Sequence, residues 1–189
     1  MIIRKTELTL VPINSPVLNL PTSPFNFTGD IDPIMLSNIM HDRMKELGGI
    51  GLAANQVGLD VTMFVLGSGD VKMSVFNPTI ISQSKEEVSL DEGCLSFPGI
   101  YMKVTRPSVI EVEYQDEHNK TIKRTLSGLT ARIFLHEYDH MLGRTFKSRV
   151  SSMKWDLAVK KKKNRTSKIA KQKVQQLFGQ IKKDITENQ

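Results

Sequence analysis

Apolar residues recur at helical spacing in the segment that follows Asp32. Asp32 is a good N-cap residue, Pro33 suits the first position of a helix, and Gly48 and Gly49 favour its termination. The sequence therefore predicts a helix from Pro33 to about Leu47, and one face of this helix is apolar: Leu36, Met40, Met44 and Leu47.

Four further segments have the composition of strands. VTMFVL (61–66) and VKMSVFNP (71–78) flank a GSGD turn, and VIEVEY (109–114) alternates between apolar residues and glutamates. A DEHNK turn connects this last segment to TIKRTL (121–126), which predicts a hairpin. The segment GIGLAANQVG (49–58) is too small and too rich in glycine to predict either regular element.

The segment SGLTARIFLHEYDHMLGR (127–144) predicts a second helix. Ser127 can cap its start and Gly143 can end it. Its apolar residues cover most of the helix circumference, as is typical of a buried helix: Leu129, Ile133, Phe134, Leu135, Tyr138 and Met141. Strands on both sides of it predict an α+β fold, in which mixed or antiparallel sheets wrap around this central helix.

Positive charge is concentrated near the C-terminus. The chain of 189 residues has a formal net charge of +6, but residues 153–189 alone carry eleven Lys or Arg and three Asp or Glu, so the rest is close to neutral. We therefore expect one domain over residues 1–150 and a basic, helical extension over residues 151–189. The extension should carry an amphipathic stripe that consists of Ala170, Val174, Leu177, Phe178, Ile181 and Ile185.

Composition excludes several classes of protein. No apolar run approaches the roughly 18–20 residues of a membrane span, and the first segment, MIIRKTELTLVPINSP, lacks the pattern of a secretory or transit peptide. A single cysteine excludes an internal disulfide and is typical of a reducing compartment. The sequence therefore predicts a cytoplasmic protein with no membrane partner.

The motif HEYDH within the predicted buried helix is typical of a metal site. His136 and His140 are four residues apart, so their imidazoles share a helix face and can hold one metal ion. Glu137 lies alongside as a candidate general base. Surface polar residues could show the same spacing, but the flanking apolar residues favour burial, where unpartnered ionisable groups are costly.

A catalytic site of this kind takes three protein ligands, so a third is needed. No histidine follows His140, and we expect His41, on the polar side of the first helix, and His118, in a hairpin turn, to be exposed. Cys94, in the loop-like segment EGCLSFPG, is the remaining candidate, because a thiolate binds Zn²⁺ or Fe²⁺ strongly. The alternative is that Cys94 is a nucleophile with His136 as its base, which leaves Glu137 and His140 without a role.

Three motifs together resemble the signatures of the peptide deformylase family. GIGLAANQ (49–56), EGCLS (92–96) and HEYDH (136–140) occur in the family's order, and the resemblance covers roughly residues 8–150. It implies that residues 1–150 are a deformylase catalytic domain. The implied reaction is removal of the N-formyl group from N-formylmethionine of nascent peptides, by attack of a metal-activated hydroxide.

The resemblance also implies a role for individual residues. Cys94, His136 and His140 would hold the metal, with Fe²⁺ as the native ion and Zn²⁺, Ni²⁺ or Co²⁺ as substitutes. Glu137 would act as general acid and base. Gln56 and the backbone N–H of Leu95 would stabilise the oxyanion, and Ile50 and Gly51 would contact the substrate backbone.

Three charged residues are expected to lie next to the metal ligands and to hold them in position: Glu92, Arg106 and Asp139. A buried carboxylate needs a partner, so we expect Arg106 to contact Glu92 or Asp139; the alternative is a surface arginine before Pro107.

The chain departs from many bacterial members after EGCLS-x-P, where it carries Gly99, Ile100 and Tyr101 instead of charged residues. This departure concerns contacts with the peptide beyond its methionine.

Two other functions remain compatible with the sequence. One is an HExxH-type metallopeptidase that cleaves ordinary amide bonds, and the other is a non-catalytic ribosome-binding protein on the same fold. The intact Glu137 and Gln56 favour an enzyme. The basic extension predicts docking to the ribosome, whose RNA attracts positive charge; the alternative is a solvated helix packed on the body. No specific DNA partner is expected.

Overall fold

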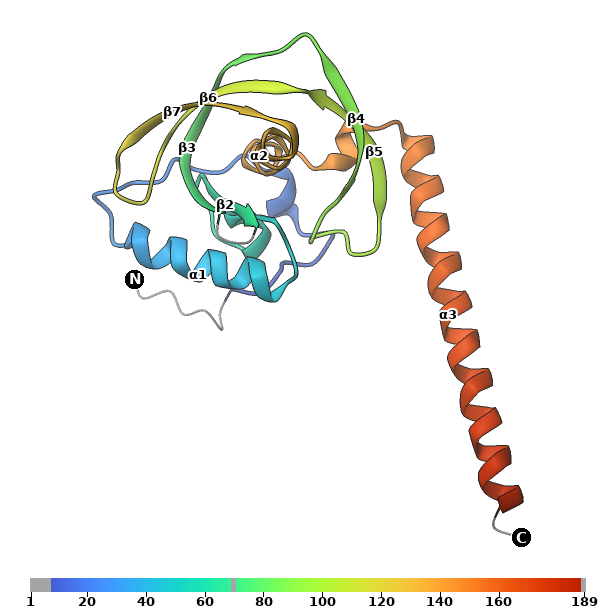
Figure 1. Ribbon diagram of the computed structural model, residues 1–189. Coiled ribbons are helices and arrows are strands. Elements are labelled where there is room, and N and C mark those ends of the chain that lie inside the picture. The colour runs from blue at the N-terminus through green and yellow to red at the C-terminus, as the bar shows by residue number, and fades with distance from the viewer. Residues whose placement is uncertain (1–7, 69–70, 188–189) are drawn as a thin grey trace.

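The computed structural model describes residues 8–68 and 71–187, and its architecture is α+β (Figure 1). Its three α-helices are α1 (Pro33–Glu46), α2 (Gly128–Met141) and α3 (Ser152–Glu187). The seven strands are β1 (Gly51–Ala53), β2 (Met63–Ser68), β3 (Val71–Gln83), β4 (Glu87–Gly93), β5 (Tyr101–Pro107), β6 (Val109–Gln115) and β7 (Thr121–Ser127). Short 3₁₀ turns are η2 (Pro16–Asn19), η3 (Ala54–Val57) and η4 (Phe146–Arg149).

All strand pairs are antiparallel. One sheet has the order β1-β2-β3-β6-β7, and β4 and β5 form a separate two-stranded ribbon. Figure 1 shows α2 end-on between this sheet and the ribbon, with α1 on the outer side of β2. The predicted α+β fold with antiparallel sheets around a buried central helix is therefore confirmed.

Burial of apolar side chains explains the position of α2. Phe134 is fully buried on the helix, and its ring makes an edge-to-face contact with Phe64 of β2 at 5.0 Å. Ala131 and Met141 extend the same core, which continues into Ile110 of β6. The helix that carries HEYDH is thus held from the sheet side by a dry core.

The first helix begins as expected, but one of its polar residues is not where the sequence predicts it. Asp32 accepts hydrogen bonds from the N–H groups of Ile34 and Met35 at 2.8 and 3.0 Å. The prediction that His41 is exposed is wrong: it is 3% exposed, and its Nε2 lies 3.3 Å from the hydroxyl of Ser74 on β3. This partner, 33 residues away, allows a polar side chain beneath the helix.

The glycine-rich segment 49–58 and the β4–β5 ribbon form regular secondary structure that their sequence patterns do not predict. Residues 51–53 form a short strand and residues 54–57 a 3₁₀ turn, so the expectation of no regular element there is wrong. All seven of these residues are buried. In β5 the buried positions alternate through Met102, Val104 and Arg106, so a charged residue occupies an inward position.

The long helix α3 leaves the body beside the β4–β5 ribbon (Figure 1). Its helical backbone agrees with the expected extension, but the side chains of 170–171 and 173–187 lie outside the described residues, and with them the whole amphipathic stripe of the extension. No described helix combines the length and the apolar character that a membrane crossing requires.

Candidate metal centre

Two elements distant in sequence bring Cys94, His136 and His140 together. The two histidines lie one turn apart on α2, and Cys94 follows the last residue of β4. Their ligand atoms all lie within 4.8 Å of one another, and Cys94 Sγ is 3.4 Å from His140 Nε2. Convergence of one sulfur and two imidazoles from separate elements is the arrangement of a three-ligand metal site.

The separation of these atoms fits a metal ion. With bonds of about 2.3 Å to sulfur and about 2.0–2.1 Å to nitrogen, a tetrahedral ion would hold the two atoms roughly 3.5 Å apart. The observed 3.4 Å matches this value. Burial lowers the pKa of His140 well below its usual value, so its imidazole is neutral and can act as a ligand.

The surroundings of His136 favour positive charge. Burial alone lowers the pKa of His136, but hydrogen bonds with Cys94 and Glu92 outweigh it and bring that pKa to about 10. A negative environment that stabilises a proton on an imidazole also stabilises a metal cation in its place. The local electrostatics therefore agree with the donor set.

Glu92 connects the candidate metal ligands to a buried ion-pair network. Its Oε2 lies 3.0 Å from Nδ1 of His136, and Arg106 donates to both of its oxygens at 2.6 and 2.9 Å. Arg106 also donates to Asp139 at 2.8 Å, so it contacts both carboxylates named in the sequence interpretation. Burial raises the pKa of Glu92, but the hydrogen bonds from His136 and Arg106 hold it at about 2, which keeps the carboxylate ionised.

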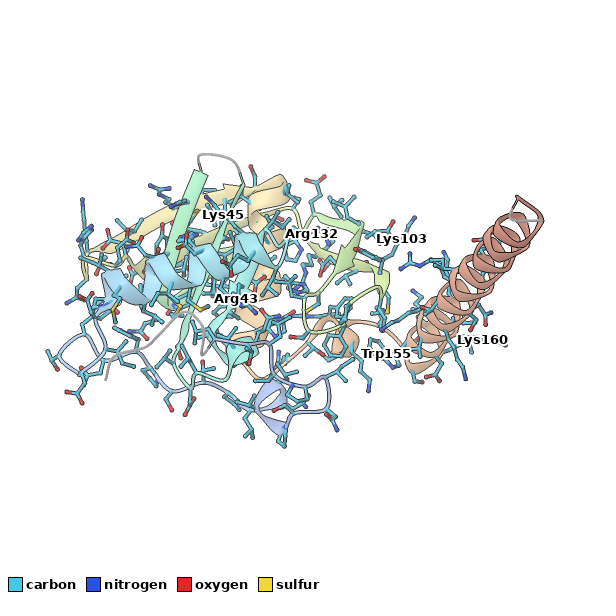
Figure 2. All side chains as sticks on the ribbon, turned by 90° about the horizontal axis from the view of Figure 1, so that it is seen from below. Arg43, Lys45, Lys103, Arg132, Trp155 and Lys160 are labelled. Atoms are coloured by element: carbon cyan, nitrogen blue, oxygen red, sulfur yellow. The ribbon has the colours of Figure 1, made fainter. Side chains whose placement is uncertain are left out.

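Two arginines complete this network and were missed from the sequence. Arg132, 6% exposed, donates to Glu92 Oε1 and to the carbonyl of Val104, both at 2.8 Å, and also to the carbonyl of Val88. Figure 2 shows Arg132 between the main body and the β4–β5 ribbon. Arg149 of η4 donates to both carboxylate oxygens of Asp139. The available signal was the position of Arg132, one turn before His136 on the same helix face.

Glu137 lies next to His136 on α2 and lines the cleft. It is 4% exposed, and among the described residues its Oε2 has no hydrogen-bond partner. Burial raises the pKa of Glu137 to about 7. A carboxyl group with that pKa can accept and release a proton near neutral pH, as general acid–base catalysis requires.

The segment 49–56 places Gln56 beside the sulfur. The amide oxygen of Gln56 accepts a hydrogen bond from the N–H of Ala53 at 2.9 Å, which fixes the orientation of the amide. Its Nε2 donates to Ser96 at 3.0 Å and lies 3.5 Å from Cys94 Sγ. Asn55 donates to the carbonyl of His140 at 2.7 Å, so this loop is tied to both ligand-bearing elements.

A cleft of about 640 Å³ opens over these groups, a volume within the usual range for small-molecule and peptide-end sites. Its lining includes most of the predicted site residues: Ile50, Gly51, Gln56, Glu92, Cys94, Leu95, His136 and Glu137. His140, Arg106 and Asp139 are not among its lining residues. Ile50 is 45% exposed in the cleft, and a Cβ atom on Gly49 would lie 2.7 Å from Leu95 Cδ1, so the two walls are in close contact.

Comparison with known proteins identifies the family. The model of the polypeptide deformylase family matches residues 8–156. The chain is 40% identical to rice (Oryza sativa subsp. japonica) peptide deformylase 1B, chloroplastic, over 149 residues, which cover 76% of this chain and 55% of the rice protein. It is 43% identical over 122 residues to the peptide deformylase of Synechocystis, covering 62% and 65% of the two chains.

Solved structures agree with these relatives. A Synechococcus elongatus peptide deformylase in complex with actinonin superposes with a TM-score of 0.75 and 33% identity, covering 82% of this chain and 85% of that one. A plant peptide deformylase superposes with a TM-score of 0.78 and 33% identity, covering 91% and 96%. The matched segment spans less than two thirds of the rice and Synechocystis relatives. With the family match over most of its length, this chain belongs to the polypeptide deformylase family.

Proposed function

We propose that this protein is a metal-dependent hydrolase that removes the N-formyl group from N-formylmethionine of nascent peptides. The observation that carries the proposal is the cluster of Cys94, His136 and His140, with the Glu137 carboxylate in the same cleft. Membership of the polypeptide deformylase family supports the substrate class. Formate release from formyl-Met-Ala-Ser is the direct test, and absence of formate from the metal-loaded protein would reject the proposal.

Cys94, His136 and His140 would hold one divalent ion. When bound, that ion supplies a Lewis acid that lowers the pKa of a water molecule and polarises the formyl oxygen. Glu92 orients His136 through Nδ1, so that the opposite ring nitrogen is free to coordinate. Arg106 and Asp139 hold Glu92 and α2 in place and act through those contacts.

Glu137 would move the proton in the reaction. Its carboxylate accepts a proton from the attacking water and then delivers it to the departing amine nitrogen of methionine. Because the pKa of Glu137 is about 7, neither transfer is strongly uphill near neutral pH. Burial keeps bulk water away from the carboxylate, which favours transfer within the cleft.

Negative charge that develops on the formyl oxygen needs donors. The Gln56 amide and the backbone N–H of Leu95 would supply them, since Gln56 Nε2 lies near Cys94 and Leu95 is the next residue. Loss of one such donor typically lowers the rate by about 10²–10³. Ile50 and Gly51 would contact the substrate backbone, because both line the cleft and Gly51 has no side chain to block approach.

Fe²⁺ is the ion that we propose as native, with Zn²⁺, Ni²⁺ or Co²⁺ as substitutes. A Cys-His-His donor set accepts each of these ions. A thiolate-bound Fe²⁺ centre with an open position is sensitive to oxygen, so activity of the iron form should decay in air faster than that of the nickel form. Metal analysis after anaerobic purification tests the identity directly, and equal half-lives in air would count against iron.

An HExxH-type metallopeptidase is the second candidate, and its supporting observation is the same ligand pair with Glu137. The two activities separate in one assay. A deformylase releases formate from the formylated tripeptide and leaves the unformylated peptide intact, whereas a metallopeptidase cleaves both peptides. A non-catalytic protein on this fold would do neither.

The basic extension would dock to ribosomal RNA, near the emerging nascent peptide. We assign residues 1–150 to the catalytic domain and residues 151–189 to this extension. Lys160, Lys161, Lys163 and Lys168 are exposed on α3. Their positive charge would release counterions from RNA, which makes binding steeply dependent on salt.

Substitution of these four lysines by glutamine tests the docking. Co-sedimentation with ribosomes at low salt should fall at least about tenfold, while hydrolysis of a free formyl-tripeptide stays unchanged. The matched control replaces four exposed lysines of the body, Lys45, Lys85, Lys103 and Lys120, and should keep co-sedimentation. Equal loss in both variants would show that only the total charge matters.

The substrate requires a compartment in which proteins are synthesised. The cytoplasm, as predicted from the sequence, meets this requirement, and so does the chloroplast, for which the rice relative is named. Fractionation of the source cells with an antibody to this protein would decide between the two.

A further inference from the structure

The first turns of α3, over residues 152–169, touch the body along a single face. Trp155, Ala158 and Lys162 are half-buried residues in an otherwise exposed stretch of α3, and Arg165 continues the same line. Their spacing of three, four and three residues places them on one side of a helix. Figure 2 shows Trp155 where α3 meets the body. The start of α3 is therefore packed rather than free.

Trp155 lies in an aromatic cluster that also packs against Cys94. Its ring makes edge-to-face contacts with Phe97 at 5.5 Å and with Phe146 at 6.2 Å, and Phe97 and Phe146 lie 5.5 Å apart. Lys147 places its ammonium group over the indole at 5.2 Å. Such contacts fix ring positions beyond what burial alone provides.

Each of the two phenylalanines adjoins a proposed metal ligand. The N–H of Phe97 donates to the carbonyl of Cys94 at 2.9 Å and closes the turn that carries the sulfur. The Phe146 ring lies 5.9 Å from the imidazole of His136 and is 1% exposed. Trp155 therefore contacts Phe97, which is hydrogen-bonded to Cys94, and Phe146, which lies against His136.

A second contact holds the same loop further along. Lys162 and Arg165 flank Gly99, where an added Cβ atom would lie 3.2 Å from Arg165 Nη2 and 3.7 Å from Lys162 Cε. Arg165 also donates to the Gly99 carbonyl at 3.4 Å. Gly99 lines the cleft. The first four turns of α3 therefore lie along the loop from Cys94 to Gly99, and both of these residues line the cleft.

We propose that the start of α3 is a clamp on the Cys94 loop, and that Trp155 is a positioning residue for the metal ligands. The proposal rests on the proposed function for the identity of the site, but it concerns retention of metal. It assigns to the first turns of the extension a part in the catalytic centre. The unit that holds the metal then extends past residue 150, where the sequence predicts the domain boundary, into the first turns of α3.

The test compares full-length Trp155→Ala with Met153→Ala, a neighbour that is 72% exposed. Both proteins are loaded with Co²⁺, and release of the ion to a chromogenic chelator is followed together with the thiolate-to-Co²⁺ absorption band. Trp155→Ala should release the ion about tenfold faster or more and shift the band, as loss of surrounding support typically weakens metal sites by 10–100-fold. Trp155→Phe should restore release to within about threefold of the parent.

Further readouts separate positioning from general loss of stability. In Trp155→Ala, kcat should fall while KM for formyl-Met-Ala-Ser changes little, because the cleft walls remain. Trp155→Leu keeps an apolar side chain and replaces the alanine variant if that one does not fold. Parental release rates and spectra in folded Trp155→Ala, or in folded Trp155→Leu where it replaces the alanine variant, would overturn the clamp. If the parent binds Co²⁺ but releases no formate, the proposed function fails and the release rates still test the clamp.

Discussion

The carboxylate of Glu137 lies directly against the backbone of Gly51. A Cβ atom added to Gly51 would be 2.9 Å from Glu137 Cδ and closer still to Oε1, and it would also lie 2.9 Å from Ile133. Real Cβ atoms essentially never approach other atoms so closely, so Glu137, the proposed general acid–base group, and strand β1, the proposed substrate contact, share space that only glycine leaves open.

Gly51→Ala should therefore lower kcat/KM for a formylated tripeptide by about 100-fold or more, because the methyl group displaces Glu137 from its position. Metal content should stay at the parental level, since none of the three ligands is touched. Gly29→Ala, where the nearest atom would be 3.2 Å away, is the matched control. An active Gly51→Ala protein would show that Glu137 can work from a different position.

Glu137→Gln should keep the metal and lose turnover by about 10²–10⁴ in kcat, since the amide cannot carry the proton and the ligands remain. Single-turnover formate release measured on protein of known metal content provides the check. Retention of substantial activity would remove Glu137 from its role as proton carrier.

Cys94→Ser should lose metal affinity, because a hydroxyl group is a poor replacement for a thiolate ligand. Equilibrium dialysis against Zn²⁺ with Ser96→Ala as the control separates loss of the ligand from disturbance of the loop. The ligand assignment would fail if Cys94→Ser bound the ion with the affinity of the parent.

Arg132→Met should lower the free energy of unfolding by about 3 kcal/mol, since it removes one buried partner of Glu92 and leaves two backbone carbonyls without their donor. Urea unfolding provides the measurement, with the exposed Arg124→Met as control. Equal midpoints for the two variants would mean that water replaces the guanidinium at little cost.

His41 should make stability depend on pH. Burial, aided by the charge of Lys72, lowers the pKa of His41 below its usual value near 6.5. As the pH falls below that value the unfolded chain takes up the proton first, so this contribution is complete above about pH 6.5 and is lost toward the lower folded pKa, by at most about 1.4 kcal/mol per pH unit.

His41→Gln keeps a side chain that can contact Ser74 but removes this titration. Denaturant unfolding at pH 8 and pH 5 should show a smaller loss of stability in the variant than in the parent. All other ionisable groups are common to both proteins, so their contributions cancel. Equal losses would mean that His41 is solvated in solution.

Much of the helical structure could be predicted because its signals are local. Asp32 caps α1 within three residues, and Gly143 follows the end of α2 with a positive φ of 65°. The spacing of His136 and His140 predicts a shared helix face in the same way, and their ligand atoms lie within 4.8 Å of each other. These features need no knowledge of distant residues.

The β4–β5 ribbon could not be predicted, because Glu92 and Arg106 occupy inward positions that a strand pattern would fill with apolar residues. Arg106 donates to Glu92 across 14 positions of sequence, and Arg132 of α2 donates to the same carboxylate. The prediction that His41 is exposed is wrong for the same reason, since its partner Ser74 belongs to another element. A buried polar pair can be recognised in a sequence only when its two members are known to be neighbours in the fold.

The hydrogen bond from Asn55 to the carbonyl of His140 spans 85 residues. Contacts of such sequence separation form late, because a long loop must close before it contributes any stabilisation. During synthesis the loop with Gln56, the turn with Cys94 and the helix with both histidines leave the ribosome one after another, and the side chains of the centre meet only when the last of them has emerged. The metal site can therefore form only after the helix with both histidines has emerged and folded against the two earlier segments.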